Sequence, residues 1–239
     1  MLELCTFSIV ARCAKTGMMG VSVSTAMPAV GSNCPHAKSG IGAIATQSWV
    51  NPYLGLDGMR LLSEGLPAAD TLERLLAGDP GRSRRQIGIV DARHNSAVYS
   101  GEDCTPWFGH RLGPGYAIQG NMLTGLETIE AMEAAFLSCD GELPERLMRA
   151  LEAGQACGGD LRGKQSAALY VVDTEEYPYV DLRVDEHTEP VAELRRVFEV
   201  AKHQLLPFIR TFPTRSDPIG RTDPAVMAMV AKSPGEREG

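Results

Sequence analysis

The order of strand-like and helix-like segments constrains the fold of this chain more than any other feature of its sequence. Period-two alternation and β-branched residues predict strands at 6–13, 17–25, 41–49, 85–95, 97–104, 116–123, 165–175 and 179–187. Helical spacing of apolar residues predicts helices at 55–65, 67–81, 125–139, 143–154 and 190–206. Strands and helix pairs thus alternate in blocks, unlike the regular βα repeat of a doubly wound parallel sheet. The order favours an α+β fold in which helix pairs cover mostly antiparallel sheets.

Two of the predicted strands carry information about their surroundings. In the first strand, Phe7 and Ile9 share one face while Thr6 and Ser8 share the other, as period two requires. The strand at 41–49 is rich in Gly and Ala, which leave little side-chain volume. We therefore expect a neighbouring layer or a ligand to approach this strand closely.

The composition excludes several classes of function. Of 239 residues, 23 are Lys or Arg and 30 are Asp or Glu, and the basic residues are scattered along the chain. This distribution predicts no nucleic-acid partner. No apolar run approaches the roughly 20 residues that span a bilayer, and the N-terminus lacks the basic and apolar regions of a secretory signal. We expect a cytoplasmic protein without a membrane partner.

The six cysteines predict free thiols rather than a disulfide framework, because no CxxC occurs and the chain is long enough to build a core. Cys34 and His36 form a CxH pattern, but this pattern is weak evidence for a site without a second pair of ligands. We therefore expect no metal and no cofactor.

The composition changes near the C-terminus. Past residue 212 the chain is rich in Pro, Gly and charged residues around one brief helical stretch. We expect a single domain at 1–212 and an accessory tail at 213–239.

Several blocks of sequence occur in a recognisable order. They are TFSIVAR, AVGSNCPHAKSGIGAIATQSWVNPYLG, GDPGRSRRQIGIVD, GYAIQGNML and LEAGQACGGDLRGKQSAALYVV. Between Thr6 and about Leu206 the chain resembles the bacterial family catalogued as domain of unknown function 1028. That family is placed with the Ntn (N-terminal nucleophile) hydrolases, so the resemblance implies a four-layer αββα sandwich, which agrees with the predicted order of elements.

The resemblance implies that Thr6 is a catalytic nucleophile. A threonine hydroxyl needs a base to remove its proton, and in this superfamily the base is the α-amine of the same residue. The amine must be free, so residues 1–5 become a candidate leader that has to be removed. Cys5 is a rival nucleophile, although it precedes the matched block. In the alternative interpretation, Thr6 is only the first β-branched residue of a strand.

Lys38 is the second catalytic candidate. In the proteasome branch of the superfamily, a lysine at a similar separation lies beside the nucleophile and helps keep its amine neutral. The alternative is an ordinary solvated lysine before a turn. The proteasome pattern also has an acidic residue on the second strand, where this chain has Ser22, Ser24 and Thr25.

Polar residues at the ends of two predicted strands suggest further contacts. Acyl transfer needs donors for the developing oxyanion, and related amidohydrolases use an Asn-Gly pair for this. Asn121 is therefore a catalytic candidate and Gln119 a substrate-binding one, although Gly-Asn is also common in turns. Gln47 and Asn51 are candidates for additional contacts with the substrate.

The segment GGDLRGKQ is a dense polar cluster before an apolar strand. Arg162 can bind a carboxylate with its planar fork and Asp160 can bind an ammonium, so these two and Gln165 are candidates for orienting an amino-acid-like or peptide-like substrate. Equally, Asp160 and Arg162 can form an internal ion pair that fixes the loop.

Two functional hypotheses follow. The first is an Ntn-type amidohydrolase that cleaves a small amide or peptide-like substrate, with Thr6 as nucleophile. The second is a non-catalytic ligand-binding protein on the same scaffold with an unprocessed N-terminus. For either, a homodimer is the default expectation because twofold pairing is the commonest assembly.

Overall fold

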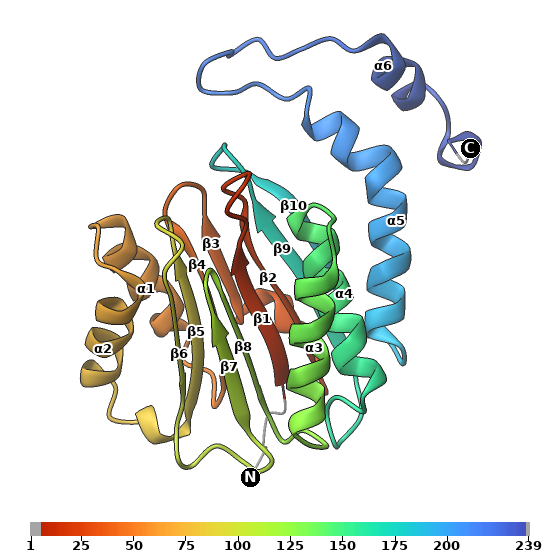
Figure 1. Cartoon of the computed structure of the whole chain (residues 1–239). Helices are drawn as coiled ribbons and strands as arrows, with labels where there is room; N and C mark the ends of the chain where they lie inside the picture. The colour runs from red at the N-terminus through yellow and green to blue at the C-terminus, as the bar shows by residue number, and fades with distance from the viewer. Residues whose placement is uncertain (1–5, 238–239) are drawn as a thin grey trace. The chain divides into compact units, whose positions relative to one another are not determined.

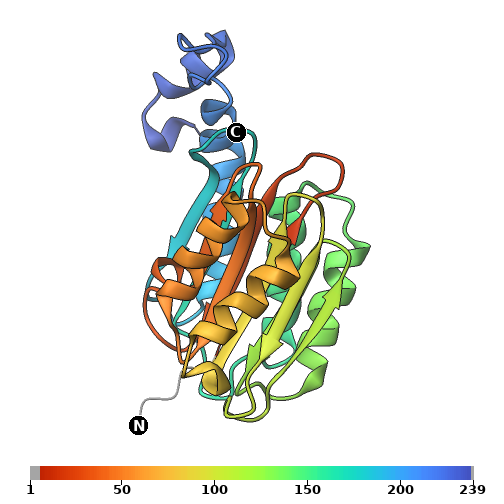
Figure 2. The same ribbon diagram turned by 90° about the vertical axis from the view of Figure 1, so that its left-hand side faces the viewer.

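The computed structural model describes residues 6–237, and Figures 1 and 2 show its elements from two sides. The strands are β1 (Thr6–Arg12), β2 (Met19–Thr25), β3 (Pro35–Lys38), β4 (Gly42–Ser48), β5 (Arg85–Asp91), β6 (Ser96–Ser100), β7 (Gly109–Gly113), β8 (Tyr116–Asn121), β9 (Ser166–Val172) and β10 (Pro178–Val184). The α-helices are α1 (Pro52–Ser63), α2 (Ala68–Gly78), α3 (Leu126–Ser138), α4 (Leu143–Ala156), α5 (Pro190–Ile209) and α6 (Pro224–Val230).

The strands form two antiparallel sheets. One sheet has six strands in the order β10-β9-β2-β1-β8-β7, and the other has four in the order β3-β4-β5-β6. The α+β class with mostly antiparallel sheets, predicted from the order of segments, is thereby confirmed. The candidate nucleophile strand β1 is internal, with β2 on one side and β8 on the other.

Apolar side chains from both sheets pack against each other. This core includes Val10 and Val21 from the six-stranded sheet and Ala43, Ala45 and Val90 from the four-stranded sheet. The small residues predicted to permit close approach therefore lie between the two sheets. The approach is needed because side chains from two layers share this space.

Helix pairs cover the outer faces of the sheets. Leu54 and Leu61 of α1 and Leu75 of α2 pack with Ile44 and Ile87 of the four-stranded sheet, and Figure 2 shows this pair in front of its strands. Figure 1 shows α3 and α4 along the six-stranded sheet.

The two faces of β1 point toward different layers of the fold, as its alternation predicts. Phe7 lies beside Gly154 of α4, where an added Cβ would come within 3.1 Å of its ring. Ser8 points the opposite way and donates a hydrogen bond to Gln47 on β4, at 2.5 Å. Thr6 shares the face of Ser8, so the strand turns its polar side chains toward the second sheet.

Two strands depart from the sequence prediction. β3 and β7 both lie in segments for which the sequence predicted no strand. Both are short strands at sheet edges, where pairing on one side only leaves a weak alternation signal.

The chain divides into two compact units, Met1–Leu194 and Arg195–Gly239. The division falls within α5 rather than at the expected residue 212, and a single domain at 1–212 stays a prediction. In residues 6–237, no helix is both long and apolar enough to cross a membrane.

Candidate functional site

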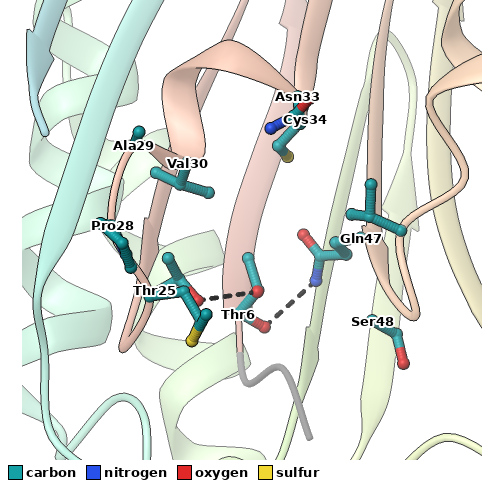
Figure 3. A pocket seen from close by; sticks show the side chains of 11 residues that line it. Thr6, Thr25, Pro28, Ala29, Val30, Asn33, Cys34, Gln47 and Ser48 are labelled. Atoms are coloured by element: carbon teal, nitrogen blue, oxygen red, sulfur yellow. Dashed lines mark hydrogen bonds between the residues drawn. The ribbon is translucent and has the colours of Figure 1, made fainter. Parts of the chain in front are cut away.

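Thr6 is the first residue of the internal strand β1, so it lies where the strands of the six-stranded sheet end and not at an edge strand. Its neighbours across the sheet are Thr25 on β2 and Asn121 on β8. The Oγ1 atoms of Thr6 and Thr25 are 3.1 Å apart and hydrogen-bonded (Figure 3). Only 4% of Thr6 is exposed, so its hydroxyl has little contact with bulk water.

A cavity of about 180 Å³ opens beside the Thr6 side chain. Figure 3 shows the side chains around it. Its lining consists of Thr6, Thr25, Met27, Pro28, Ala29, Val30, Asn33, Cys34, Gln47, Ser48 and Val50. Among these lining residues there is no Asp, Glu, His, Lys or Arg, so the candidate site is apolar on one side and neutral throughout.

Hydrogen bonds hold the loop that forms the apolar wall of this cavity. The backbone N–H of Ala29 donates to the carbonyl of Asp185 at 2.9 Å, and that of Val30 donates to Ser166 Oγ at 3.1 Å. The same Ser166 hydroxyl donates to the carbonyl of Met27 at 2.5 Å. Ala29 takes a left-handed backbone conformation with φ of 57°, which a non-glycine residue adopts at a cost. The wall is therefore fixed by its connections to the β9 and β10 strands.

Gln47 connects the candidate nucleophile to the second sheet. Its Nε2 donates to the carbonyl oxygen of Thr6 at 3.1 Å and to Gln86 Oε1 at 2.8 Å, while its Oε1 accepts from Ser8. Gln47 is 1% exposed. Since a buried amide keeps its orientation only while its partners are satisfied, Gln47 fixes the backbone of Thr6 relative to β4.

The network continues through the buried side-chain amides of Gln86, Asn121 and Gln119. Gln86 Oε1 also accepts from Asn121 Nδ2 at 2.9 Å, and Gln119 Nε2 donates to Ser8 Oγ at 2.7 Å. Asn121 Oδ1 and Gln119 Oε1 have no hydrogen-bond partner among the described residues. The structure thus brings Thr6, Gln47, Gln119 and Asn121 together. It places Gln119 and Asn121 within the layer between the sheets, and neither lines the cavity.

Lys38 requires a correction. It is the last residue of β3, is exposed, and pairs with Gly42 at the opposite end of β4 from Gln47. At about 3.3 Å per strand residue, the five residues from Gly42 to Gln47 separate these ends by roughly 16 Å. The expectation that Lys38 lies beside Thr6 is therefore wrong. The proteasome spacing does not transfer, because β3 here carries its lysine away from the nucleophile end.

Asn51 has a structural position outside the cavity. It is the N-cap of α1, where its Oδ1 accepts from the backbone N–H of Tyr53 at 3.2 Å. Its Nδ2 reaches Asp79 Oδ2 at 3.4 Å, and the Arg85 guanidinium donates to the same carboxylate oxygen at 2.8 Å. Burial raises the pKa of Asp79, but the hydrogen bonds from Arg85, Gly81 and Asn51 outweigh it and leave the pKa below its usual value.

We expect Asn51→Ala to lower the free energy of unfolding by about 1 kcal/mol, because the helix loses its cap. Asn51→Ser serves as the matched control, since its hydroxyl keeps a capping oxygen without placing a second carboxylate beside Asp79. Chemical denaturation of the three proteins measures the difference. Equal losses for the two variants would contradict the capping role.

The GGDLRGKQ cluster is mainly a scaffold for the loop after β2. The Asp160 carboxylate accepts from the backbone N–H groups of Ala26, at 3.0 Å, and Arg162, at 2.8 Å. Arg162 Nη2 lies 3.3 Å from Asp160 Oδ2, so the internal ion pair considered from the sequence is present. The backbone N–H of Gln165 donates to the carbonyl of Thr25 at 2.8 Å. None of Asp160, Arg162 and Gln165 lines the cavity beside Thr6.

Cys34 lines the cavity, but its environment does not suit a nucleophile. The side chain is 1% exposed, and burial raises the pKa of its thiol to about 12. A thiol with that pKa stays protonated near neutral pH, and the thiolate is the reactive form. Cys34 is therefore an apolar part of the wall. Among residues 6–237, no group of three or more His, Cys, Asp or Glu is placed to hold a metal ion.

Comparison with known proteins identifies the family. The model of a family described as "Family of unknown function (DUF1028)" matches residues 6–194. The chain belongs to the DUF1028 family. The crystal structure of protein SPO2555 from Silicibacter pomeroyi, which is described with the same family, is 27% identical and superposes with a TM-score of 0.83. That match covers 92% of this chain and 100% of the other. No curated protein matches the sequence.

Sequence reasoning missed three residues that shape this DUF1028 site. Thr25 contacts the Thr6 hydroxyl, Gln86 joins the amides of Gln47 and Asn121, and Ser48 borders the cavity. A signal for Gln86 was present, because glutamine interrupts an apolar strand in RQIGIV, in ATQSW and in AIQGN alike. Three such interruptions predict a shared polar layer, since each buried amide needs partners.

Proposed function

We propose that this DUF1028 protein is an Ntn-type amidohydrolase that cleaves a small amide or peptide-like substrate with Thr6 as nucleophile. Two features support the proposal. Helix pair, sheet, sheet and helix pair follow one another as in the four-layer αββα sandwich of that superfamily. The family match also begins at Thr6, the residue whose amine would have to be free.

The absence of a titratable base around the cavity carries the proposal. Thr6 opens on a cavity whose lining residues include no carboxylate, imidazole or lysine amine. The threonine hydroxyl cannot act without a base. A free α-amine on Thr6 itself supplies one on the same residue, which is the arrangement that Ntn chemistry uses.

The proposed reaction has two halves. The α-amine takes the Thr6 hydroxyl proton while Oγ1 attacks the amide carbon, and the amine then returns that proton to the leaving nitrogen as the C–N bond breaks. This leaves an ester on Thr6 and releases the amine product. Water attacks the ester with the α-amine again as base, which releases the acid and restores the hydroxyl.

The oxyanion donor in this scheme is the backbone N–H of Ser48. Thr46 donates its N–H to the carbonyl of Cys34 at 3.1 Å, and residues two apart in a strand present their N–H groups to the same side. We propose that the N–H of Ser48 faces the same side, beyond Ala45, where the pairing of β4 with β3 ends. Ser48 lines the cavity, and in Figure 3 its side chain points away from Thr6. We assign this role to Ser48 instead of Asn121, whose amide nitrogen already donates to Gln86.

One observation favours the second candidate, a non-catalytic binding protein. Lys38 lies far from Thr6, so no described lysine helps keep a Thr6 amine neutral in the way that the proteasome resemblance implied. A cavity with a fixed wall serves ligand binding whether or not the amine is ever released. Met1 to Cys5, whose removal separates the two functions, lie outside the described residues.

A covalent probe tests the proposal without a known substrate. A β-lactone acylates an activated hydroxyl by opening its own ring, so the adduct retains the whole mass of the reagent. We expect protein purified without an N-terminal tag to lack Met1 to Cys5 by intact mass. We further expect one adduct, which peptide mapping places on Thr6.

Two variants provide the controls for this labelling. Thr6→Ala should lose the adduct, while Ser48→Ala should keep it, because only the backbone of Ser48 takes part. A full-length mass without an adduct would favour the binding protein. An adduct on Thr25 would overturn the assignment of Thr6.

A further inference from the structure

The lining of the Thr6 cavity contains enough information to define the group that it accepts. Met27, Pro28, Ala29 and Val30 form one wall and Val50 belongs to the segment on the other side, with the Cys34 thiol also in the lining. Two polar members of the lining already have partners, since the Thr6 hydroxyl is hydrogen-bonded to Thr25 and the Gln47 amide donates to Gln86. A ligand in this space therefore meets mainly apolar atoms.

Charge restricts the ligand further. None of the lining side chains is ionisable near neutral pH, because burial raises the pKa of the Cys34 thiol to about 12. An ion moved from water into such a space loses its hydration without gaining a partner, and this costs far more than the transfer of an apolar group gains. The cavity excludes substituents that carry a charge.

Volume sets the size of the ligand. At about 180 Å³, the cavity is slightly larger than the roughly 150 Å³ apolar cavity that is known to hold benzene. Because hydrogen bonds from Ala29, Val30 and Ser166 fix the wall, this volume exists before any ligand binds. A preformed cavity avoids the entropic cost of ordering a loop.

From these observations we infer that the cavity is the acyl-group pocket of the enzyme and that it takes a neutral, apolar substituent no larger than about a six-membered ring. That this substituent is the acyl group of a substrate rests on the proposed function. That it is neutral and apolar rests on the cavity alone. Val30 lines this cavity at the start of the short helical turn Val30–Ser32.

Two amides of matched shape test the inference. Cyclohexanecarboxamide carries a neutral ring, and piperidine-4-carboxamide replaces the far ring carbon with a protonated nitrogen. Ligand-observed NMR titration of the full chain measures both dissociation constants. We expect the neutral amide to bind at least about tenfold more tightly, since tenfold corresponds to only about 1.4 kcal/mol.

Variants locate the binding. Val30→Trp and Val50→Phe fill the cavity from two sides and should each abolish binding of the neutral amide. Two such variants are used so that the test still works if one of them fails to fold. Val200→Trp, which adds the same indole at a side chain that is 44% exposed, should bind as the wild type does. No detectable binding by the wild type, equal binding of the two amides, or unchanged binding by the filled variants would each overturn the inference.

Failure of this inference is distinguishable from failure of the proposed function. Selective binding without a β-lactone adduct on Thr6 would keep the cavity as a binding site and reject the hydrolase. An adduct on Thr6 without selective binding would keep the hydrolase and reject the apolar acyl group.

Discussion

Asp160→Ala is expected to lower the free energy of unfolding by about 3 kcal/mol, because two partly buried backbone N–H groups lose the buried carboxylate that accepts from them. The Asp160 side chain is 1% exposed and holds the backbone N–H groups of Ala26 and Arg162. In a protein of this size, the loss should appear as a fall in Tm of roughly 6 to 12 °C.

Arg162→Ala should cost less than about 1 kcal/mol, since the Arg162 side chain is partly exposed and the backbone N–H groups of Ala26 and Arg162 still bind the Asp160 carboxylate. The Arg162 side chain is 29% exposed, and its Nη2 lies 3.3 Å from the carboxylate. Asp181→Ala, at an exposed position of β10, controls for the loss of a carboxylate as such. Thermal denaturation of the three variants measures the differences. Equal falls in Tm for Asp160→Ala and Arg162→Ala would show that the ion pair, and not the backbone contacts, is what stabilises the loop.

Gln47→Leu is expected to cost about 3 to 5 kcal/mol, the upper range for a single substitution. Leucine has a similar size but no polar atoms, so the carbonyl of Thr6, Gln86 Oε1 and the Ser8 hydroxyl all lose a partner at once. Gln86 Oε1 keeps its bond from Asn121 and Ser8 Oγ keeps its bond from Gln119, but the Ser8 hydroxyl proton loses its acceptor and the Thr6 carbonyl loses a donor. A buried polar group without a partner costs about 1 to 3 kcal/mol.

Thr46→Val is the matched control for Gln47→Leu. Thr46 is the preceding residue of β4, is 0% exposed, and its hydroxyl has no hydrogen-bond partner among the described residues. Replacing that hydroxyl with a methyl group should leave the stability unchanged or raise it slightly. Urea denaturation compares the two variants. A loss for Thr46→Val as large as that for Gln47→Leu would mean that packing on β4, rather than the amide network, sets the stability.

The sequence predicted the fold class because its signals were local and repeated. Alternation in β1 correctly separated Phe7 from Thr6 and Ser8, and the order of segments correctly indicated antiparallel sheets. The edge strands β3 and β7 were missed because each is short and pairs on one side only. The location in the cell and the expected homodimer stay predictions.

The candidate site was harder to predict, because it depends on register. Gln47, Gln119 and Asn121 were found from their strand-end positions, and register then determined which of them borders the cavity. Lys38 was misplaced for the same reason, since its separation from Thr6 along the chain does not fix the direction in which β3 runs. Asp160 was identified as part of a polar cluster, but its backbone partner Ala26 is 134 residues away, and no local pattern indicates such a pairing.

The internal position of β1 determines when during biosynthesis the site can exist. One neighbour of β1 is β8, and the hydrogen bond from Gln119 to Ser8 joins residues 111 positions apart. Its other neighbour, β2, pairs on its far side with β9 (Ser166–Val172). Thr6 is therefore synthesised early, but the nascent chain cannot enclose it until most of the remaining chain has been translated. Prematurely terminated chains lack the strands that surround this threonine, so they cannot form the site and should not show its reactivity.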